Sequence, residues 1–207
     1  MTECLAESLY LTNLPLNVYH PDVLQDLQDC YRLHQRLMQT FPETVPEDFR
    51  YLYRIEPQHS RILLQATMRP NLAALPEEYL TSTTILPTRT IVPQQIRPTT
   101  YRFRLNGNTR YRDVRSGKRI FIDEPKEQMQ WLRRQGERHG FTIQKLYSLR
   151  PYNAVGQKRN HQITISGIQF NGILTVTDAA QFYDALAGGV GGGKAFGFGL
   201  VSIAKTR

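Results

Sequence analysis

Residues 188–200 read GGVGGGKAFGFGL and hold seven of the chain's fourteen glycines, together with one lysine, Lys194. Glycine tolerates positive φ angles and lets a backbone approach another molecule closely. A run of exposed backbone N–H groups beside one cation suits a phosphate group. Because the apolar residues LVSIA follow at 200–204, this stretch predicts a loop that holds a polyanion and then enters a last strand.

Two other interpretations of this stretch are open. The spacing from Gly188 to Lys194 is that of a P-loop, but Ala195 stands where Ser or Thr would bind magnesium, and too little chain follows for the required helix. A flexible linker is the second alternative, although the flanking residues are apolar rather than rich in Ser and Thr. We therefore prefer the polyanion-binding loop.

The charge of the chain is concentrated in its second half. The net charge is +8; residues 1–98 carry 8 Lys and Arg against 11 Asp and Glu, whereas residues 99–207 carry 18 against 7. No carboxylate occurs between Arg138 and Thr177. This segregation predicts a polyanion-binding C-terminal half, because a basic surface that served only solubility would not require it.

Several classes of protein are excluded by what the sequence lacks. No apolar run approaches the ~20 residues that span a bilayer, and the first residues do not resemble a signal peptide. We therefore expect a cytoplasmic protein without a membrane partner. Cys4 and Cys30 form no metal-ligand or redox motif, and no acidic pair or His/Cys cluster indicates a metal site. We expect no cofactor.

The first half, residues 1–98, predicts one small domain. An amphipathic helix over 22–41 is the clearest element, with apolar residues repeating at three and four positions. The other predicted elements are strands at 8–13, 49–56 and 61–66, a turn at 57–60, a short helix at 72–79, a strand near Ile85 and a connection over 87–98.

The second half, residues 99–207, predicts strand, helix, strand, strand, helix and strand. The predicted elements are strands at 101–105, 141–150 and 200–204, a further strand made of 161–165 and 168–176 that is bent or broken at Gly167 and Gly172, helices at 125–140 and 178–187, a turn at 106–108 and a basic loop at 151–160. This βαββαβ order is typical of ferredoxin-like and RNA-recognition domains. The first half has the same order with a degraded second helix, so we expect an α+β protein of two tandem ferredoxin-like domains, residues 1–98 and 99–207.

Tyr31 and His34 interrupt the apolar stripe of the helix predicted at 22–41. Residues three apart on a helix are neighbours on one face. Histidine is the side chain whose unperturbed pKa suits proton transfer near neutral pH. Periodicity alone favours a core histidine packed beside a tyrosine, and a functional pair facing a cleft is the alternative.

Basic residues alternate with aromatic ones between positions 101 and 119, a pattern that suits both the backbone and the bases of RNA. A second basic pair lies in the loop predicted at 151–160. The candidate RNA-binding side chains are Arg102, Arg104, Arg110, Arg112, Arg115, Lys118, Arg119, Lys158 and Arg159.

The glycine stretch resembles the defining motif of the repeat-associated RNA-binding proteins of CRISPR systems, and the chain is most similar to their CasE-type endoribonucleases. The family motif is Gly-hydrophobic-Gly, five residues that include Lys or Arg, and a second Gly-hydrophobic-Gly. Here the two triplets stand at 189–191 and 197–199, with Lys194 between them. The segment YRLHQ at 31–35 is similar to the Tyr-x-x-His stretch of these enzymes. Residues 67–98 match least.

The resemblance implies a metal-independent endoribonuclease that binds the CRISPR repeat RNA hairpin and cuts precursor CRISPR RNA on the 3′ side of the stem. The expected products end in a 5′-hydroxyl and a 2′,3′-cyclic phosphate. His34 would be the general base or general acid, and Tyr31 would position the sugar-phosphate or share the proton transfer. The residues that would hold the RNA backbone in the glycine motif are Gly189, Gly191, Lys194, Gly197 and Gly199.

Other Cascade subunits are expected partners of a protein of this kind. Two alternatives remain at the level of sequence. The chain could be a non-catalytic RNA-binding subunit of the same surveillance complex, or a basic ferredoxin-like scaffold without RNA. The Tyr31/His34 pair favours the enzyme over the first, and the glycine motif and the charge segregation argue against the second.

Overall fold

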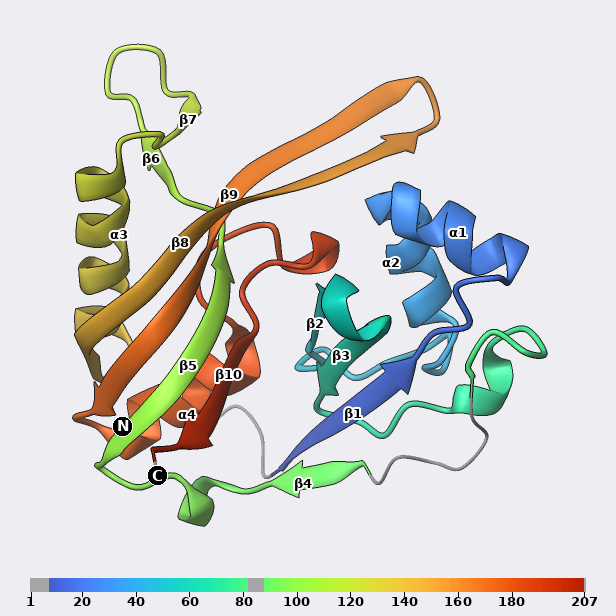
Figure 1. Cartoon of the computed structure of the whole chain (residues 1–207), viewed down its shortest axis with the longest axis horizontal. Coiled ribbons are helices and arrows are strands. Elements are labelled where there is room, and N and C mark those ends of the chain that lie inside the picture. The colour runs from blue at the N-terminus through green and yellow to red at the C-terminus, as the bar shows by residue number, and fades with distance from the viewer. Residues whose placement is uncertain (1–7, 82–87, 207) are drawn as a thin grey trace.

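A computed structural model describes residues 8–81 and 88–206 and contains two antiparallel four-stranded sheets with helices packed against them (Figure 1). The strand orders are β2-β3-β1-β4 and β10-β5-β9-β8. In both sheets the first and third strands of a βαββαβ unit lie in the centre and the second and fourth lie at the edges, which is the ferredoxin-like arrangement. The predicted α+β class and repeated fold are confirmed.

The first sheet carries its two helices on one side. Its elements are β1 (Leu9–Pro15), α1 (Pro21–Gln28), α2 (Cys30–Met38), β2 (Tyr51–Glu56), β3 (Arg61–Ala66) and β4 (Arg89–Ile91). Val23, Leu33 and Leu37 are fully buried in the core beneath α1 and α2, together with Ile62 and Leu64 of β3. This sheet and its helices carry Tyr31 and His34.

The single helix expected over 22–41 is wrong, because Asp29 divides it into α1 and α2. Asp29 has extended φ and ψ angles of −133° and 106°. Its Oδ1 accepts hydrogen bonds from the N–H groups of Tyr31 (2.8 Å) and Arg32 (3.1 Å), so it is the N-cap of α2. His34 therefore lies in the second turn of a short helix, and its side chain is half-buried rather than in the core.

The segment before the second sheet departs most from the sequence prediction. The helix expected at 72–79 is one 3-10 turn, η2 (Leu72–Ala74), because Pro76 disfavours helical backbone at Leu75. The strand expected near Ile85 lies outside the described residues. The connection expected over 87–98 contains β4, which pairs with β1 as the edge strand of the first sheet.

The second sheet has helices on one side as well. The second half of the chain contains β5 (Thr100–Gly107), β6 (Arg110–Arg112), β7 (Arg119–Phe121), α3 (Pro125–Arg138), β8 (Phe141–Lys158), β9 (His161–Val176), α4 (Ala179–Gly188) and β10 (Val201–Lys205). The second sheet is made of β5, β8, β9 and β10, whereas β6 and β7 pair with each other in a separate two-stranded sheet. Asp178 is the N-cap of α4, as expected. The turn expected at 106–108 is wrong, since Asn106 and Gly107 continue β5 and pair with Gln169 and Ile168.

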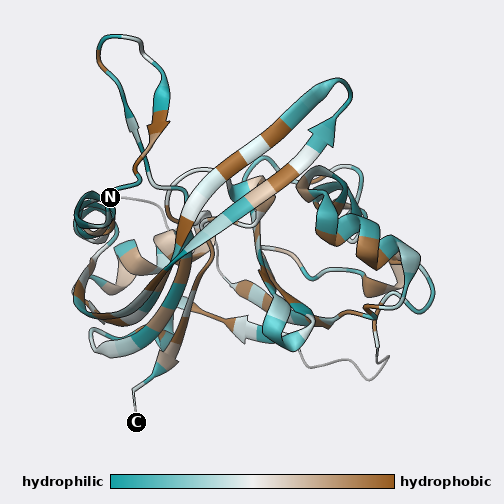
Figure 2. Ribbon diagram, turned by 45° about the horizontal axis from the view of Figure 1, so that its top comes forward, coloured by the Kyte–Doolittle hydropathy of each residue, from teal (hydrophilic) through white to brown (hydrophobic). Residues whose placement is uncertain are grey.

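The basic loop expected over 151–160 is also wrong. β8 continues to Lys158 and β9 begins at His161, so the two strands form one long hairpin whose turn contains Arg159. Pro151 does not end β8 because this strand lies at the sheet edge, where a missing N–H costs no ladder bond. β5 pairs with β9 only as far as Ile168. Residues 152–167, here called the outer hairpin, therefore project as a two-stranded ribbon toward α1 and α2 (Figures 1 and 2).

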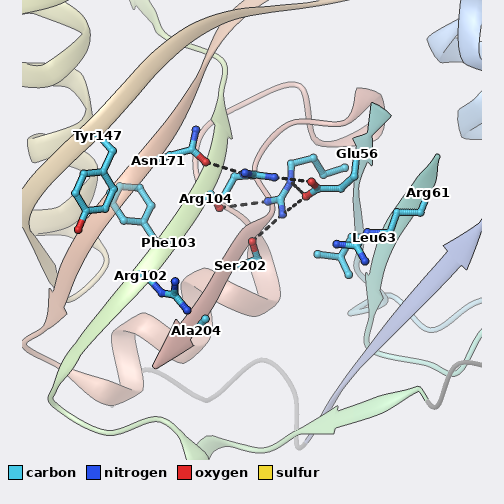
Figure 3. A pocket seen from close by; sticks show the side chains of 12 residues that line it. Glu56, Arg61, Leu63, Arg102, Phe103, Arg104, Tyr147, Asn171, Ser202 and Ala204 are labelled. Carbon is cyan, nitrogen blue, oxygen red and sulfur yellow. Dashed lines mark hydrogen bonds and ion pairs between the residues drawn. The ribbon is translucent and has the colours of Figure 1, made fainter. Parts of the chain in front are cut away.

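An ion-pair network joins the two sheets across a cavity of about 370 Å³ (Figure 3). Arg54 of β2 is 2% exposed and donates to Glu56 Oε1 at 2.8 Å, to Ser202 Oγ at 2.7 Å and to the carbonyl oxygens of Arg104 and Leu200. Arg104 donates to the other oxygen of Glu56. Burial opposes ionisation of Glu56, but Arg54 and Arg104 outweigh it and hold the pKa of its carboxyl below the ordinary value.

The predicted domain boundary between residues 98 and 99 falls between β4 and β5, and the division into two domains stays a prediction. Within the described residues, no helix is long and apolar enough to cross a membrane.

Candidate active site

His34 lies where four elements meet. Its Nδ1 is hydrogen-bonded to the hydroxyl of Tyr51 on β2, and the two rings stack with centroids 5.8 Å apart. The ring of Phe196, in the 3-10 turn η4 (Lys194–Phe196) of residues 188–200, meets His34 edge-on at 6.1 Å. Since Nδ1 is occupied, Nε2 is the nitrogen left for a substrate.

The charge state of His34 follows from this environment. Burial lowers the pKa of His34, and the charge of Lys158 lowers it further. Burial also raises the pKa of Tyr51 above its ordinary value, so its hydroxyl stays protonated. His34 is therefore a neutral imidazole near pH 7, with one ring nitrogen that donates and one that accepts.

Tyr31 and Lys158 complete the set of side chains around His34. The ring centroid of Tyr31 lies 6.2 Å from that of His34, as expected for residues three apart on α2. Lys158, at the end of β8 in the outer hairpin, places its Nζ 5.3 Å from the centroid of the Tyr31 ring. The first half of the chain thus provides the histidine and tyrosine, and the second half provides the cation.

Residues 189–200, here called the glycine loop, follow the end of α4 at Gly188, and their glycines fold the loop against both sheets. Gly189, Gly191, Gly193, Gly197 and Gly199 all have φ angles between 74° and 87°, which other residues rarely adopt. A Cβ added at Gly189 would lie 2.8 Å from Leu52. A Cβ added at Gly191 would lie 3.0 Å from Trp131, and one added at Gly197 would lie 2.8 Å from Tyr152 Oη. Val190 and Phe198, between these glycines, are completely buried.

The backbone donors of this loop differ from the sequence expectation. The N–H of Gly189 donates to Ala185 O at 2.9 Å, and that of Gly199 donates to Asn106 O at 2.8 Å. These two amides are already used inside the protein and cannot serve as the exposed phosphate donors that the sequence suggested. Lys194 is exposed and precedes Phe196 in η4. The glycines therefore hold the loop in the position that brings Phe196 to His34.

The predicted RNA-binding cations lie in three separate places. Lys158 and Arg159 are on the outer hairpin, and Arg102 and Arg104 line the cavity between the sheets (Figure 3). Arg104 is held there by Glu56 and by Asn171, whose Oδ1 accepts from its Nε at 2.6 Å. The remaining five lie on or between β6 and β7, a hairpin that projects beside α3, away from α1 and α2 (Figures 1 and 2): Arg110, Arg112, Arg115, Lys118 and Arg119.

Tyr51 and Phe196 were not singled out from the sequence. Tyr51 lies in a strand of alternating apolar and polar residues, where a tyrosine is an ordinary half-buried residue. Phe196 lies between two triplets that draw attention to the glycines. Neither carried a local signal, because each becomes part of the site only through tertiary packing. Among the described residues, no three His, Cys, Asp or Glu side chains gather as a metal site would require.

The fold and site together define an α+β protein with two ferredoxin-like sheets and a basic hairpin placed over a histidine–tyrosine pair. A family model described as CRISPR associated protein matches residues 9–205. The chain belongs to this family of CRISPR-associated proteins.

Two curated relatives and one solved structure show how far the similarity extends. The CRISPR-associated endoribonuclease Cse3 of Thermus thermophilus is 28% identical over 95% of this chain and 100% of its own length. The CRISPR system Cascade subunit CasE of Escherichia coli K12 is 28% identical over 86% of this chain and 92% of its own. A structure of Thermus thermophilus Cse3 bound to an RNA representing a pre-cleavage complex has a TM-score of 0.84 and 28% identity, covering 96% of this chain and all of that one.

Proposed function

We propose that this protein is an endoribonuclease that binds the hairpin of CRISPR repeat RNA and cleaves precursor CRISPR RNA on the 3′ side of the stem. Its Thermus relative is a CRISPR-associated endoribonuclease, with a structure that holds RNA in a pre-cleavage complex, and its Escherichia relative is a Cascade subunit. The observation in this chain that carries the proposal is the neutral, half-buried His34, whose Nδ1 is bonded to Tyr51 and which lies with Tyr31 and Lys158.

The proposed reaction uses the nucleophile that RNA itself contains. Nε2 of His34 takes the proton of the 2′-hydroxyl, the 2′-oxygen attacks the adjacent phosphorus, and the bond to the 5′-oxygen breaks. The products are a 2′,3′-cyclic phosphate and, after the leaving oxygen gains a proton, a 5′-hydroxyl. A metal is not needed in this mechanism, because alignment, proton transfer and charge stabilisation supply the rate increase.

Each side chain has a distinct role in this scheme. The lowered pKa of His34 favours the general base over the general acid, because the imidazole is already unprotonated at neutral pH. For that role the ring proton is on Nδ1, and this N–H donates a hydrogen bond to the hydroxyl oxygen of Tyr51. Tyr31 is the proposed proton donor to the 5′-oxygen, and the Lys158 cation offsets the negative charge that grows on the phosphate.

RNA binding falls mainly to the second half of the chain in this proposal. Duplex RNA is recognised largely by shape and backbone, so many cations with few base contacts are expected. The outer hairpin and the β6–β7 hairpin both project with exposed basic side chains that could reach such a backbone. Residues 1–98 then act as the domain that carries Tyr31 and His34, residues 99–207 act as the RNA-binding domain, and the protein works in the cytoplasm with other Cascade subunits.

The decisive experiment is cleavage of a labelled repeat hairpin in EDTA, followed by identification of both ends. A matched substrate with a single 2′-deoxy nucleotide at the cut site should bind equally well and stay intact. Cleavage of the deoxy substrate would show that the 2′-hydroxyl is not the nucleophile. A protein that binds both hairpins and cuts neither would be the non-catalytic subunit.

A further inference from the structure

The outer hairpin needs support from the rest of the molecule. Beyond Ile168, among the described residues, its two strands pair only with each other, and an isolated two-stranded ribbon is marginally stable in water. Its strands nevertheless reach the N-terminus of α2, where Gly156 and Gln157 lie against Asp29. The position of Lys158 relative to Tyr31 and His34 therefore depends on what holds this ribbon against α2.

Asp29 makes the polar contact between the outer hairpin and α2. One carboxylate oxygen, Oδ1, caps α2 through the N–H groups of Tyr31 and Arg32. The other, Oδ2, accepts a hydrogen bond at 3.2 Å from the backbone N–H of Gln157, the residue before Lys158. A single carboxylate thus fixes both the start of the helix that carries His34 and the strand that carries the cation.

Gly156 allows the hairpin to come this close. A Cβ at this position would lie 2.5 Å from Asp29 Oδ1 and 3.0 Å from the backbone nitrogen of Cys30. The carboxylate oxygen is held by two capping bonds and the nitrogen belongs to a helix, so neither yields easily. A side chain at 156 would therefore push the ribbon away from α2.

A small apolar cluster adjoins the contact between Asp29 and the outer hairpin. Cys30, Ala154 and Phe198 are buried together, and Tyr152, Ile163, Ile165 and Phe196 pack against them. Since Phe196 also contacts His34, the cluster joins α2, the outer hairpin and the glycine loop at one point. The polar contact at Asp29 is next to this cluster in the chain, because Asp29 precedes Cys30 and its partner Gln157 precedes Lys158.

We propose that Asp29 is a positioning residue, which docks the outer hairpin on α2 and thereby holds the Lys158 cation over Tyr31 beside His34. The inference rests on the proposed function for its catalytic consequence. The docking of the hairpin by Asp29 is a property of the free protein and does not depend on that function. The carboxylate needs no particular side chain on the hairpin, because it binds the backbone of residue 157 and Gly156 provides the space.

The docked position affects proton transfer through the surroundings of His34. The groups that face its ring are Tyr31 from its own helix, Tyr51 from β2, Phe196 from η4 and Lys158 from β8. Lys158 is the one permanent cation among them, and it disfavours a second positive charge on the imidazole. Moving the hairpin away should raise the pKa of His34 toward its ordinary value and remove the cation from the phosphate.

Two variants test this arrangement by different routes. Gly156→Ala blocks the approach by adding one methyl group to the hairpin. Asp29→Asn keeps an oxygen that can cap α2 but replaces the acceptor of the Gln157 N–H by an amide donor. Gly188→Ala is the matched control, because a Cβ there has open space and the backbone is not in the positive-φ region. Thermal melts establish that each variant is folded before it is used.

Two measurements then decide the inference. In free protein, the pKa of His34 is followed by NMR titration of its ring protons, and it should rise in both variants and stay unchanged in Gly188→Ala. With RNA at saturating protein, the single-turnover cleavage rate should fall on the order of 10- to 100-fold, as expected for a misplaced catalytic group. An unchanged His34 titration in both variants overturns the inference, whether or not cleavage slows.

The two proposals fail in different ways. If the wild-type protein does not cut RNA at all, the proposed function is wrong, and the titration alone still decides whether Asp29 places Lys158 beside His34. If the wild type cuts and both variants cut at the same rate, the proposed function stands and the positioning role of Asp29 is wrong.

Discussion

The ring of Phe196 meets the ring of His34 edge-on, with centroids 6.1 Å apart, although one residue lies in the glycine loop and the other in α2. The contact exists because the glycines at positive φ fold the loop back toward the first sheet, where Gly189 packs on Leu52. The glycine motif and the histidine, which the sequence presents as separate features, are thus parts of one site.

Replacing His34 by Ala should lower the single-turnover cleavage rate by roughly 10²- to 10⁴-fold, the range expected for loss of one acid–base group. Affinity for the repeat hairpin should be retained, because the basic hairpins are not altered. His59→Ala is the control, since His59 is exposed in the turn between β2 and β3. Wild-type cleavage by the His34 variant would move the proton-transfer role to another residue.

Removing the hydroxyl of Tyr51 should weaken the orientation of His34 while the ring stacking remains. In Tyr51→Phe we expect cleavage to slow by about 5- to 10-fold, corresponding to one net hydrogen bond of about 1 kcal/mol. Tyr53→Phe is a matched control two residues away, because the buried Tyr53 hydroxyl has no hydrogen-bond partner among the described residues. That control should keep its cleavage rate and its stability. Equal rates for the two variants would remove Tyr51 from the proposed mechanism.

The pH dependence of cleavage distinguishes the two possible roles of His34. Burial and Lys158 both lower its pKa, so the neutral imidazole persists to lower pH than for an ordinary histidine at 6.5. As a general base, His34 should give a single-turnover rate that is flat around neutral pH and falls only as the pH drops through its lowered pKa, below the 6.5 of an ordinary histidine. A rate that instead rises as the pH is lowered from 7 would assign the general-acid role. The NMR titration of the His34 ring in free protein provides the independent pKa.

Much of the fold follows from the sequence, because periodicity and turn residues are local signals. The order of strands and helices, the cap at Asp178 and the strand Arg61–Ala66 all depend on neighbours in the chain. Errors arise where a residue has two permissible roles. Asp29 is compatible with a polar helix position but acts as an N-cap, and Pro151 suggests a loop but lies in an edge strand.

The candidate site was less accessible to sequence reasoning. Tyr31 and His34 are recognisable because helical spacing places them side by side. The groups that set the charge and orientation of His34 come from β2, the glycine loop and the outer hairpin. Their approach depends on sheet register and on the length of β8, which local patterns do not specify. For the same reason, the sequence does not show that Arg104, a candidate RNA contact, is paired with Glu56 across the two sheets.

The glycine motif should be intolerant of side chains for reasons internal to the protein. Gly197 has a φ of 86°, and an added Cβ would lie 2.8 Å from the Tyr152 hydroxyl. Gly197→Ala should therefore lower the free energy of unfolding by about 1–3 kcal/mol, the usual range for a strained backbone position. Gly192→Ala, with open space and no positive φ, should change it by less than about 0.5 kcal/mol. Urea unfolding without RNA makes the comparison, and equal stabilities would mean that the loop conformation is not under this constraint.

The ion-pair network between the sheets should make stability depend on Glu56. In Glu56→Gln the buried Arg54 loses its charge partner, and breaking a buried pair in this way costs about 3 kcal/mol or more. The folded-state pKa of Glu56 is depressed, so its contribution is present above the unfolded pKa of about 4.3 and is lost as the pH falls through the folded value. Urea unfolding at pH 7 and at pH 3 should therefore show a large difference between wild type and variant at pH 7 that shrinks at pH 3. Glu43→Gln is the control for loss of an exposed carboxylate. A stability difference that is the same at both pH values would mean that Glu56 acts through packing rather than through its charge.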